Sequence, residues 1–222
     1  MNLKSLLAAR HDAGRPVRIG LIGAGKFGSM ILAQARFIEG YHIVGVADLD
    51  VYKARGSFKR TGWDDRQYAA PTMAQAVRTG TTCITDDVAA LLACDDIECI
   101  IEATGHPLAG TRHALAAIDA GKHVIMVNVE ADVLCGAVLA NRAAQQGVVY
   151  SMAYGDQPAA ICELVDWVHA CGFELCAAGK GMNFAPPYRY STPDTVWGYF
   201  GWSEEEVAAG DFNPKMYNSF TD

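Results

Sequence analysis

The chain has 222 residues, of which 51% are hydrophobic and 19% charged, so it can bury a full core. Its 18 lysines and arginines against 25 aspartates and glutamates give a net charge of −7, the wrong sign for a nucleic-acid-binding protein. No apolar run reaches the roughly 20 residues of a membrane helix, and no signal peptide is evident. We therefore expect a globular cytoplasmic protein that binds neither nucleic acid nor membrane.

The first 80 residues begin with a regular alternation of helix and strand. We expect a short helix over residues 3–13, a strand buried on both faces over 17–22, a helix that reaches about residue 38, and a strand over 43–47. Residues 52–80 are less regular, with a loop over 63–67 and a helix over 73–78.

The alternation returns after residue 82. We expect strands over 83–85, 98–102, 123–127 and 148–152, and helices over 88–94, 113–120 and 133–146. This pattern predicts an α/β fold with a doubly wound parallel sheet. A helix over 158–170 and a strand over 173–178 follow, and the aromatic and proline-rich stretch after residue 182 suggests the start of a second layer.

A glycine-rich loop, Gly23-x-Gly25-x-x-Gly28, follows the first strand and opens a helix, which is the context of a dinucleotide-binding loop. Gly23 allows a tight turn, Gly25 lets the backbone approach a pyrophosphate, and Gly28 lets helix and strand pack closely. The helix N-terminus adds free N–H groups for the anion. We expect the loop, with Lys26 and Phe27, to bind a dinucleotide; a structural turn without a nucleotide is the alternative.

Asp48 ends the second strand, where a carboxylate accepts hydrogen bonds from the adenosine ribose hydroxyls. That carboxylate would repel a 2′-phosphate, and residues 49–51 contain no arginine to neutralise one. The sequence therefore predicts NAD as the cofactor. NADP stays an alternative because Lys53 and Arg55 follow.

Two loops at the carboxyl ends of later strands are expected to face the nicotinamide. The first holds the small residues Ala103, Thr104 and Gly105, followed by His106, which is either a proton donor or a residue at a helix N-terminus. The second holds three polar residues. Asn128 would face the cofactor, Glu130 would act as a general acid or base or orient a substrate hydroxyl, and Asp132 would cap the next helix.

Two residues of the last third are candidates for the chemistry of the substrate. Asp156 precedes a predicted helix and either caps it or orients the substrate. Lys180 lies between two glycines after a predicted strand, and its ammonium could stabilise the alkoxide that develops during hydride transfer. A surface turn is the alternative for Lys180.

The seven cysteines include no C-x-x-C pair, and no histidine lies at zinc-finger spacing from them. We expect small buried side chains kept reduced, with a metal site or a catalytic thiol as the alternatives. No metal is expected.

Six segments together resemble a known family: IGLIGAGKFG (19–28), ITDD (84–87), EATGHP (102–107), GKHVIMVNVEAD (121–132), YGDQP (154–158) and AAGKG (177–181). The chain resembles the homoserine-dehydrogenase-like NAD(P)-dependent oxidoreductases that carry a C-terminal SAF domain, and among them the deoxyxylulose-phosphate reductoisomerase-like enzymes. The resemblance implies a Rossmann domain over 1–152, followed over 153–222 by the beginning of an α/β domain for substrate binding and dimerisation.

The resemblance also implies roles and partners. Homoserine dehydrogenases use a lysine and an aspartate of the second domain at the hydroxyl carbon, and Lys180 and Asp156 are the matching candidates. A small-molecule substrate and a homodimer or larger homo-oligomer are expected, and the family's greater length implies that the chain is an N-terminal portion. The sequence departs from the family in three places. It has no Asp-Ser-Glu metal motif, and it has Ala47-Asp-Leu-Asp50 where relatives that prefer NADPH carry basic residues. Val129, not a lysine, follows Asn128.

The sequence thus predicts an NAD(P)-dependent oxidoreductase that transfers hydride to or from a small polar hydroxy or keto compound, with a sugar phosphate as the more specific substrate. The alternatives are a homoserine dehydrogenase and a dinucleotide-binding module without catalysis.

Overall fold

The computed structural model describes residues 2–154, 157–179, 190–192, 194–199 and 201–209. The chain divides into two compact units, Met1–Ala160 and Ile161–Asp222, and each is described by itself.

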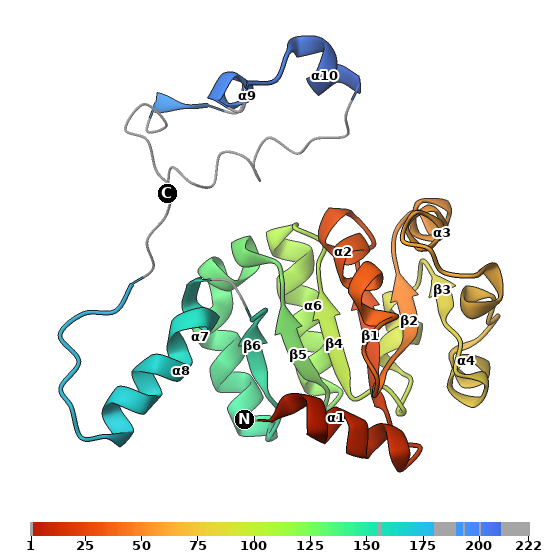
Figure 1. The fold of residues 1–222 in the computed structure, drawn as a ribbon, viewed down its shortest axis with the longest axis horizontal. Coiled ribbons are helices and arrows are strands. Elements are labelled where there is room, and N and C mark those ends of the chain that lie inside the picture. The colour runs from red at the N-terminus through yellow and green to blue at the C-terminus, as the bar shows by residue number, and fades with distance from the viewer. Residues whose placement is uncertain (1, 155–156, 180–189, 193, 200, 210–222) are drawn as a thin grey trace. The chain divides into compact units, whose positions relative to one another are not determined.

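The first unit is built on a six-stranded sheet in the order β3-β2-β1-β4-β5-β6, in which all neighbouring strands are parallel (Figure 1). The strands are β1 (Val17–Ile22), β2 (Tyr41–Ala47), β3 (Cys83–Thr85), β4 (Cys99–Glu102), β5 (His123–Met126) and β6 (Tyr150–Met152). The chain moves outward from β1 to β3 and then returns to β4 on the other side of β1. This confirms the doubly wound parallel sheet, whose strand order reverses between β1 and β4, where ligands of such sheets bind.

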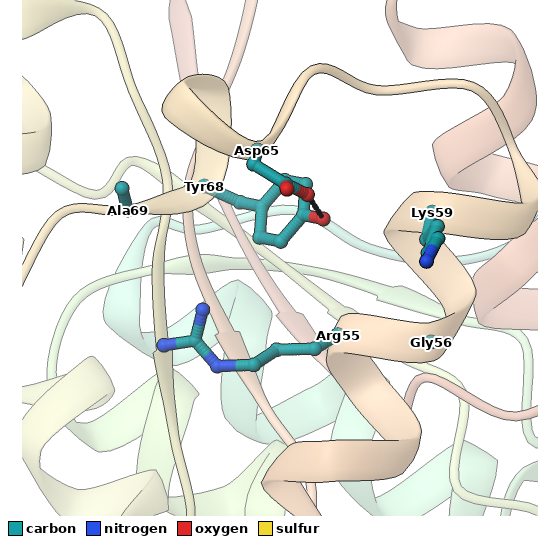
Figure 2. Close-up of a pocket in the computed structure, with 6 residues that line it drawn as sticks. All are labelled: Arg55, Gly56, Lys59, Asp65, Tyr68 and Ala69. Carbon is teal, nitrogen blue, oxygen red and sulfur yellow. Dashed lines mark hydrogen bonds between the residues drawn. The ribbon is translucent and has the colours of Figure 1, made fainter.

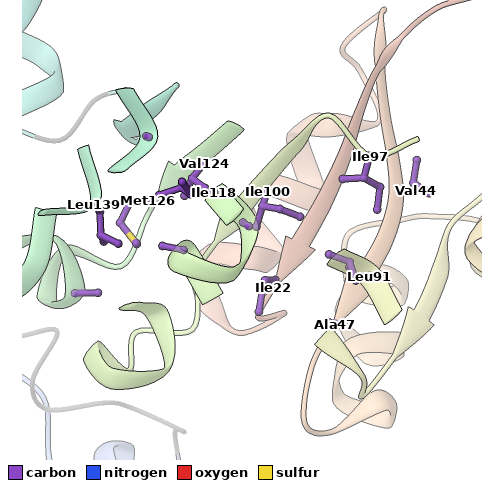
Figure 3. Close-up of a cluster of buried hydrophobic side chains, with 14 of the residues drawn as sticks. Ile22, Val44, Ala47, Leu91, Ile97, Ile100, Ile118, Val124, Met126 and Leu139 are labelled. Atoms are coloured by element: carbon purple, nitrogen blue, oxygen red, sulfur yellow. The ribbon is translucent and has the colours of Figure 1, made fainter. Parts of the chain in front are cut away.

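Helices cover both faces of this sheet. They are α1 (Leu3–Asp12), α2 (Lys26–Ala35), α3 (Val51–Arg60), η1 (Asp65–Tyr68), α4 (Met73–Thr79), α5 (Val88–Leu92), α6 (Pro107–Asp119) and α7 (Val129–Gln146). Leu21 of β1 packs with Leu32 of α2 and Phe58 of α3 on one face. On the other face Ile22 belongs to a cluster with side chains of α4 to α7 (Figure 3). Neighbouring residues of β1 enter opposite cores because strand side chains alternate.

The amino ends of the strands are held by polar contacts. Helix α1 has no buried residue, and Arg10 attaches it by donating to both carboxylate oxygens of Glu98 at 2.7 and 2.8 Å. Lys122 precedes β5 and is only 3% exposed. Its Nζ donates to the carbonyl oxygens of Cys94 and Ile97, at 2.7 and 2.9 Å.

The N-caps explain one helix that was not predicted, α3, and two helices that begin earlier than predicted, α6 and α7. Asp50 caps α3 by accepting from the N–H groups of Tyr52 and Lys53, so a helix occupies part of the region expected to be irregular. Helix α6 begins at Pro107, six residues early, because His106 caps it and proline suits the first turn. Asn128 caps α7, so the prediction that Asp132 is the cap is wrong.

After β6 the described residues include three helices: α8 (Gln157–Ala170), α9 (Val196–Tyr199) and α10 (Glu204–Ala209). The strand predicted over 173–178 is absent, because these residues find no partner strand among the described residues, and a lone strand leaves its backbone groups unpaired. The indoles of Trp197 and Trp202 stack with their ring centroids 6.0 Å apart.

All seven cysteines are free, as expected, but their burial differs from the prediction. Cys83 is buried, and Cys94, Cys99 and Cys135 are half-buried. The remaining three, which lie in or after α8, are exposed: Cys162, Cys171 and Cys176. Within the described part of the chain, no helix is long and apolar enough to cross a membrane. The same residues contain no cluster of side chains suited to a metal ion.

Candidate dinucleotide-binding site

The three glycines of the loop between β1 and α2 occupy different surroundings. Gly23 has φ +95°, a conformation that side chains disfavour, and a Cβ there would lie 2.8 Å from the carbonyl oxygen of Ala103. A Cβ on Gly28 would collide with the carbonyl oxygen of Gly23, whereas a Cβ on Gly25 would meet no atom within 4 Å. Gly23 and Gly28 are therefore required by the fold, and Gly25 leaves space open beside the backbone.

That open space lies at the start of α2. Gly25 is the N-cap of this helix and has no side chain to accept hydrogen bonds from the first turn. Lys26 and Phe27 are the first two helical residues, and both are exposed. The helix thus presents its partial positive charge to a surface with room for an anion, which fits the pyrophosphate of a dinucleotide.

Asp48 follows β2 and is held against the glycine loop. Its Oδ2 accepts from the N–H of Ala24 at 2.7 Å, and its Oδ1 accepts from the N–H of Asp50 at 3.0 Å. The buried Ser57 of α3 donates from Oγ to the carbonyl oxygen of Ala24 at 2.8 Å. Because both polar groups of Ala24 are engaged, the loop and the carboxylate are fixed relative to each other. Sequence reasoning missed Ser57, since a serine inside a helix carries no signal for such a contact.

The basic residues after Asp48 lie on α3. Arg55 and Lys59 line a cavity of about 460 Å³ together with Gly56, Asp65, Tyr68 and Ala69 (Figure 2). The hydroxyl of Tyr68 donates to the carboxylate of Asp65 on the η1 side of this cavity. No residue of the glycine loop is among those that line this cavity.

A buried polar network joins the loops after β4 and β5. Glu102, at the end of β4, is completely buried. Its Oε1 accepts from the Oγ1 of Thr104 at 2.6 Å and contacts the Nδ1 of His113 at 3.2 Å, while its Oε2 has no partner among the described residues. Gly110 of α6 leaves room for this carboxylate, because a Cβ there would lie 2.9 Å from Oε2.

Asn128 connects the second loop to this network. Its Oδ1 accepts from the N–H of Ala131, as the cap of α7, at 3.2 Å. Its Nδ2 donates to the carbonyl oxygen of His106 at 3.1 Å and to the Oγ1 of Thr104 at 3.3 Å. The structure therefore brings Thr104, His106 and Asn128 together. It adds Glu102, to which the sequence assigned no role, and His113 and Gly110, which the sequence did not single out.

The side chains of the remaining candidate residues cap a helix, are exposed or make other contacts. The Nδ1 of His106 accepts from the N–H of Ala109 at 3.3 Å, so this ring caps α6. Glu130 is exposed on the first turn of α7, where a negative charge suits the helix dipole. Asp132 accepts from the hydroxyl of Tyr150 at 2.7 Å, and burial together with this hydrogen bond raises the pKa of Tyr150. Lys180 and Asp156 lie outside the described residues.

The fold and the glycine loop define a dinucleotide-binding Rossmann domain: open space and a helix N-terminus at Gly25, an anchored Asp48, and polar loops at the ends of β4 and β5. The family model described as the NAD-binding domain of homoserine dehydrogenase matches residues 19–151. The chain therefore belongs to this family, and its cofactor is a nicotinamide dinucleotide, NAD, with NADP as the alternative.

A second family model matches the residues that follow this domain. The family model described as the catalytic domain of oxidoreductase DRL matches residues 155–222. A comparison with curated protein sequences gives no match.

Among solved structures, myo-inositol dehydrogenase from Lactobacillus casei, in complex with NAD(H) and myo-inositol, has a TM-score of 0.50 at 18% identity. The match covers 69% of this chain and 42% of that one. The oxidoreductase yvaA from Bacillus subtilis has a TM-score of 0.48 at 18% identity, with 71% and 40% covered. Homoserine dehydrogenase from Thiobacillus denitrificans has a TM-score of 0.46 at 20% identity, with 62% and 29% covered. The chain thus spans less than half the length of these proteins.

Proposed function

We propose that the chain contains the cofactor-binding part of an NAD-dependent oxidoreductase that transfers hydride to or from a small polar hydroxy or keto compound. The observation that carries this proposal is the anchored Asp48 beside the open space at Gly25. Bound NAD⁺ would accept hydride from a hydroxy compound, or bound NADH would donate it to a keto compound, and the loops of Thr104 and Asn128 would hold the nicotinamide half. The match of residues 155–222 to an oxidoreductase catalytic domain supports a substrate-binding role for the second part.

In this proposal the substrate contacts come from three residues. Lys180 would stabilise the negative charge that develops on the substrate oxygen, because an ammonium in a partly desolvated site does so strongly. Asp156 and Glu130 would orient the substrate hydroxyl groups. Both Lys180 and Asp156 fall within the segment that matches the catalytic domain, and the exposure of Glu130 leaves its carboxylate accessible to a ligand.

A sugar phosphate, handled by a reductoisomerase-like reaction, is the more specific substrate that we propose, on the resemblance of the segments quoted above. Homoserine is the second candidate, because the family model that matches residues 19–151 is drawn from homoserine dehydrogenases. A domain boundary near residue 152 and assembly into a homo-oligomer stay predictions. Light scattering on the purified chain would test the assembly.

Activity assays separate these candidates. NAD⁺ reduction by the purified chain would be followed with sugar acids, sugar phosphates and homoserine. Turnover of one class identifies the substrate, whereas tight NAD binding without turnover on any of them would leave a binding module. If Lys180→Ala retained the kcat of the unchanged chain, the role of Lys180 would be wrong.

We expect NAD to be preferred over NADP, because the fixed carboxylate of Asp48 would repel a 2′-phosphate. Asp48→Asn keeps an oxygen that can accept from the N–H of Ala24 but removes the charge. The ratio of the Kd for NADPH to the Kd for NADH, measured by fluorescence titration, should exceed about tenfold in the unchanged chain and fall in the variant, a tenfold change being about 1.4 kcal/mol. Equal or tighter binding of NADPH by the unchanged chain would contradict the preference.

A further inference from the structure

The buried carboxylate of Glu102 is unusual because its charge is only partly balanced. Its Oε1 accepts from the N–H and the hydroxyl of Thr104, at 3.4 and 2.6 Å. Because a carboxylate only accepts hydrogen bonds, the Nδ1 of His113 donates to the same oxygen. The second oxygen is buried and receives no hydrogen bond from the described residues. Hydrogen bonds from these donors stabilise the negative charge on one side alone.

No strong cation neutralises this charge within the described residues. Its ion-pair partner there is His113, and neither lysine nor arginine reaches it. A second carboxylate, that of Asp132 in the first turn of α7, accepts a hydrogen bond from Tyr150 of β6. Burial, the hydrogen bond from Tyr150 to Asp132 and the nearby negative charges, that of Glu102 among them, raise the pKa of Tyr150.

Glu102 also lies in the half of the sheet that serves the nicotinamide. A dinucleotide crosses a doubly wound sheet where the strand order reverses, with one mononucleotide over each half. Asp48 and the glycine loop assign the adenosine half to β1, β2 and β3, which leaves β4, β5 and β6 for the nicotinamide. Glu102 is the last residue of β4, and its partner Thr104 belongs to the loop that follows.

We propose that the buried charge of Glu102 makes this site favour the oxidised cofactor, NAD⁺, over NADH. The nicotinamide ring carries a positive charge in NAD⁺ and none in NADH, and a negative charge in a low-dielectric interior attracts only the former. Glu102 is thus a specificity-determining residue that acts through space and through Thr104, without touching the cofactor. This inference rests on the assignment of NAD to the site described above.

Three variants of the full chain test this assignment, with the Kd of NAD⁺ and of NADH as the readouts. Glu102→Gln removes the charge at nearly constant shape, and it should weaken NAD⁺ about tenfold, or about 1.4 kcal/mol, while NADH changes less than about twofold. Glu102→Asp keeps the charge, so the ratio of the two Kd values should stay the same, even if both Kd values rise. Glu98→Gln is the matched control, because it makes the same substitution at the opposite end of β4, and it should change neither value.

The ratio of the Kd values for NAD⁺ and NADH distinguishes an effect of the Glu102 charge from a purely structural role of this residue. A carboxylate that only positions Thr104 would, when replaced, weaken both cofactor forms equally, and that outcome would overturn the proposal. If Glu102→Gln fails to fold, the unchanged chain still decides, because it should bind NAD⁺ at least as tightly as NADH. Tighter binding of NADH than of NAD⁺ by the unchanged chain would refute the inference. Failure of both nucleotides to bind would instead refute the assignment of NAD to the site.

Discussion

Single residues of the glycine loop differ in what they contribute to folding and to binding. Gly28 is packed against the carbonyl of Gly23, whereas Gly25 faces open space. The same chemical change, glycine to alanine, should therefore have opposite consequences at two positions three residues apart. This contrast separates the part of the motif that the fold requires from the part that the cofactor requires.

We expect Gly25→Ala to keep the stability of the chain within about 1 kcal/mol and to weaken NAD binding at least about tenfold, because the added methyl group occupies the space next to the backbone. Gly28→Ala should lower the free energy of unfolding by roughly 2–4 kcal/mol, because backbone must move to relieve the collision. Denaturant unfolding and NAD titration measure both. Weaker folding in the first variant than in the second would contradict the structure.

The elements of the first unit were largely predictable from sequence, and the exceptions have a common cause. Strands such as β1 and β3 were predicted with their observed bounds, because a buried parallel strand is a short apolar run. Helix α3 was not predicted, and α6 and α7 begin earlier than the apolar pattern indicated, because the caps Asp50, His106 and Asn128 fix where each helix starts. A cap depends on the local backbone conformation and is hard to read from composition.

The candidate site was predictable only in its outline. The glycines, Asp48 and the small residues of the loop after β4 were found because each belongs to a motif with fixed spacing. Glu102 and His113 were missed, because they lie eleven residues apart and meet only when α6 packs on the sheet. Gly110 was missed for the same reason, since its lack of a side chain matters only beside Glu102 and Asn128.

The cap of α7 provides a test of the link between two loops. Asn128→Asp keeps an oxygen that caps the helix but loses the Nδ2 that donates to the carbonyl of His106. Because Asn128 is 2% exposed, we expect the free energy of unfolding to fall by about 1–3 kcal/mol. Asp87→Asn on the exposed cap of α5 is the reciprocal control and should cost less than about 0.5 kcal/mol. Equal losses in both variants would show that the link to His106 contributes nothing.

The two units of the chain differ in how their cysteines are covered. Those of the first unit are buried or half-buried, and burial raises the pKa of Cys99 to about 12. Burial also raises the pKa of Cys83. Since the thiolate is the reactive form, a raised pKa keeps these thiols protonated and slow at pH 8. The cysteines of the second unit are exposed and lack the protection of burial.

Brief treatment of the native chain with iodoacetamide at pH 8 should thus modify Cys162, Cys171 and Cys176 well before Cys83 and Cys99. Peptide mapping by mass spectrometry measures the order, and the unfolded chain, in which all seven thiols should react together, is the control. Raising the pH toward 12 should increase the rate at Cys99, because its thiolate forms only there. Labelling of Cys99 as fast as Cys171 at pH 8 would contradict the packing of β4.

The buried ionisable side chains at the two ends of the strand pair β4 and β5 are of opposite charge type, one basic and one acidic. Lys122, held by two carbonyl groups, lies at the amino end of β5, and Glu102 lies at the carboxyl end of the adjacent β4. The strand pair is in effect an internal electric dipole whose negative pole lies at the edge proposed to bind the cofactor. Under the proposal above, substitutions in the interior of such a domain would change its relative affinity for the oxidised and the reduced nucleotide. Every residue that contacts the nucleotide would stay the same.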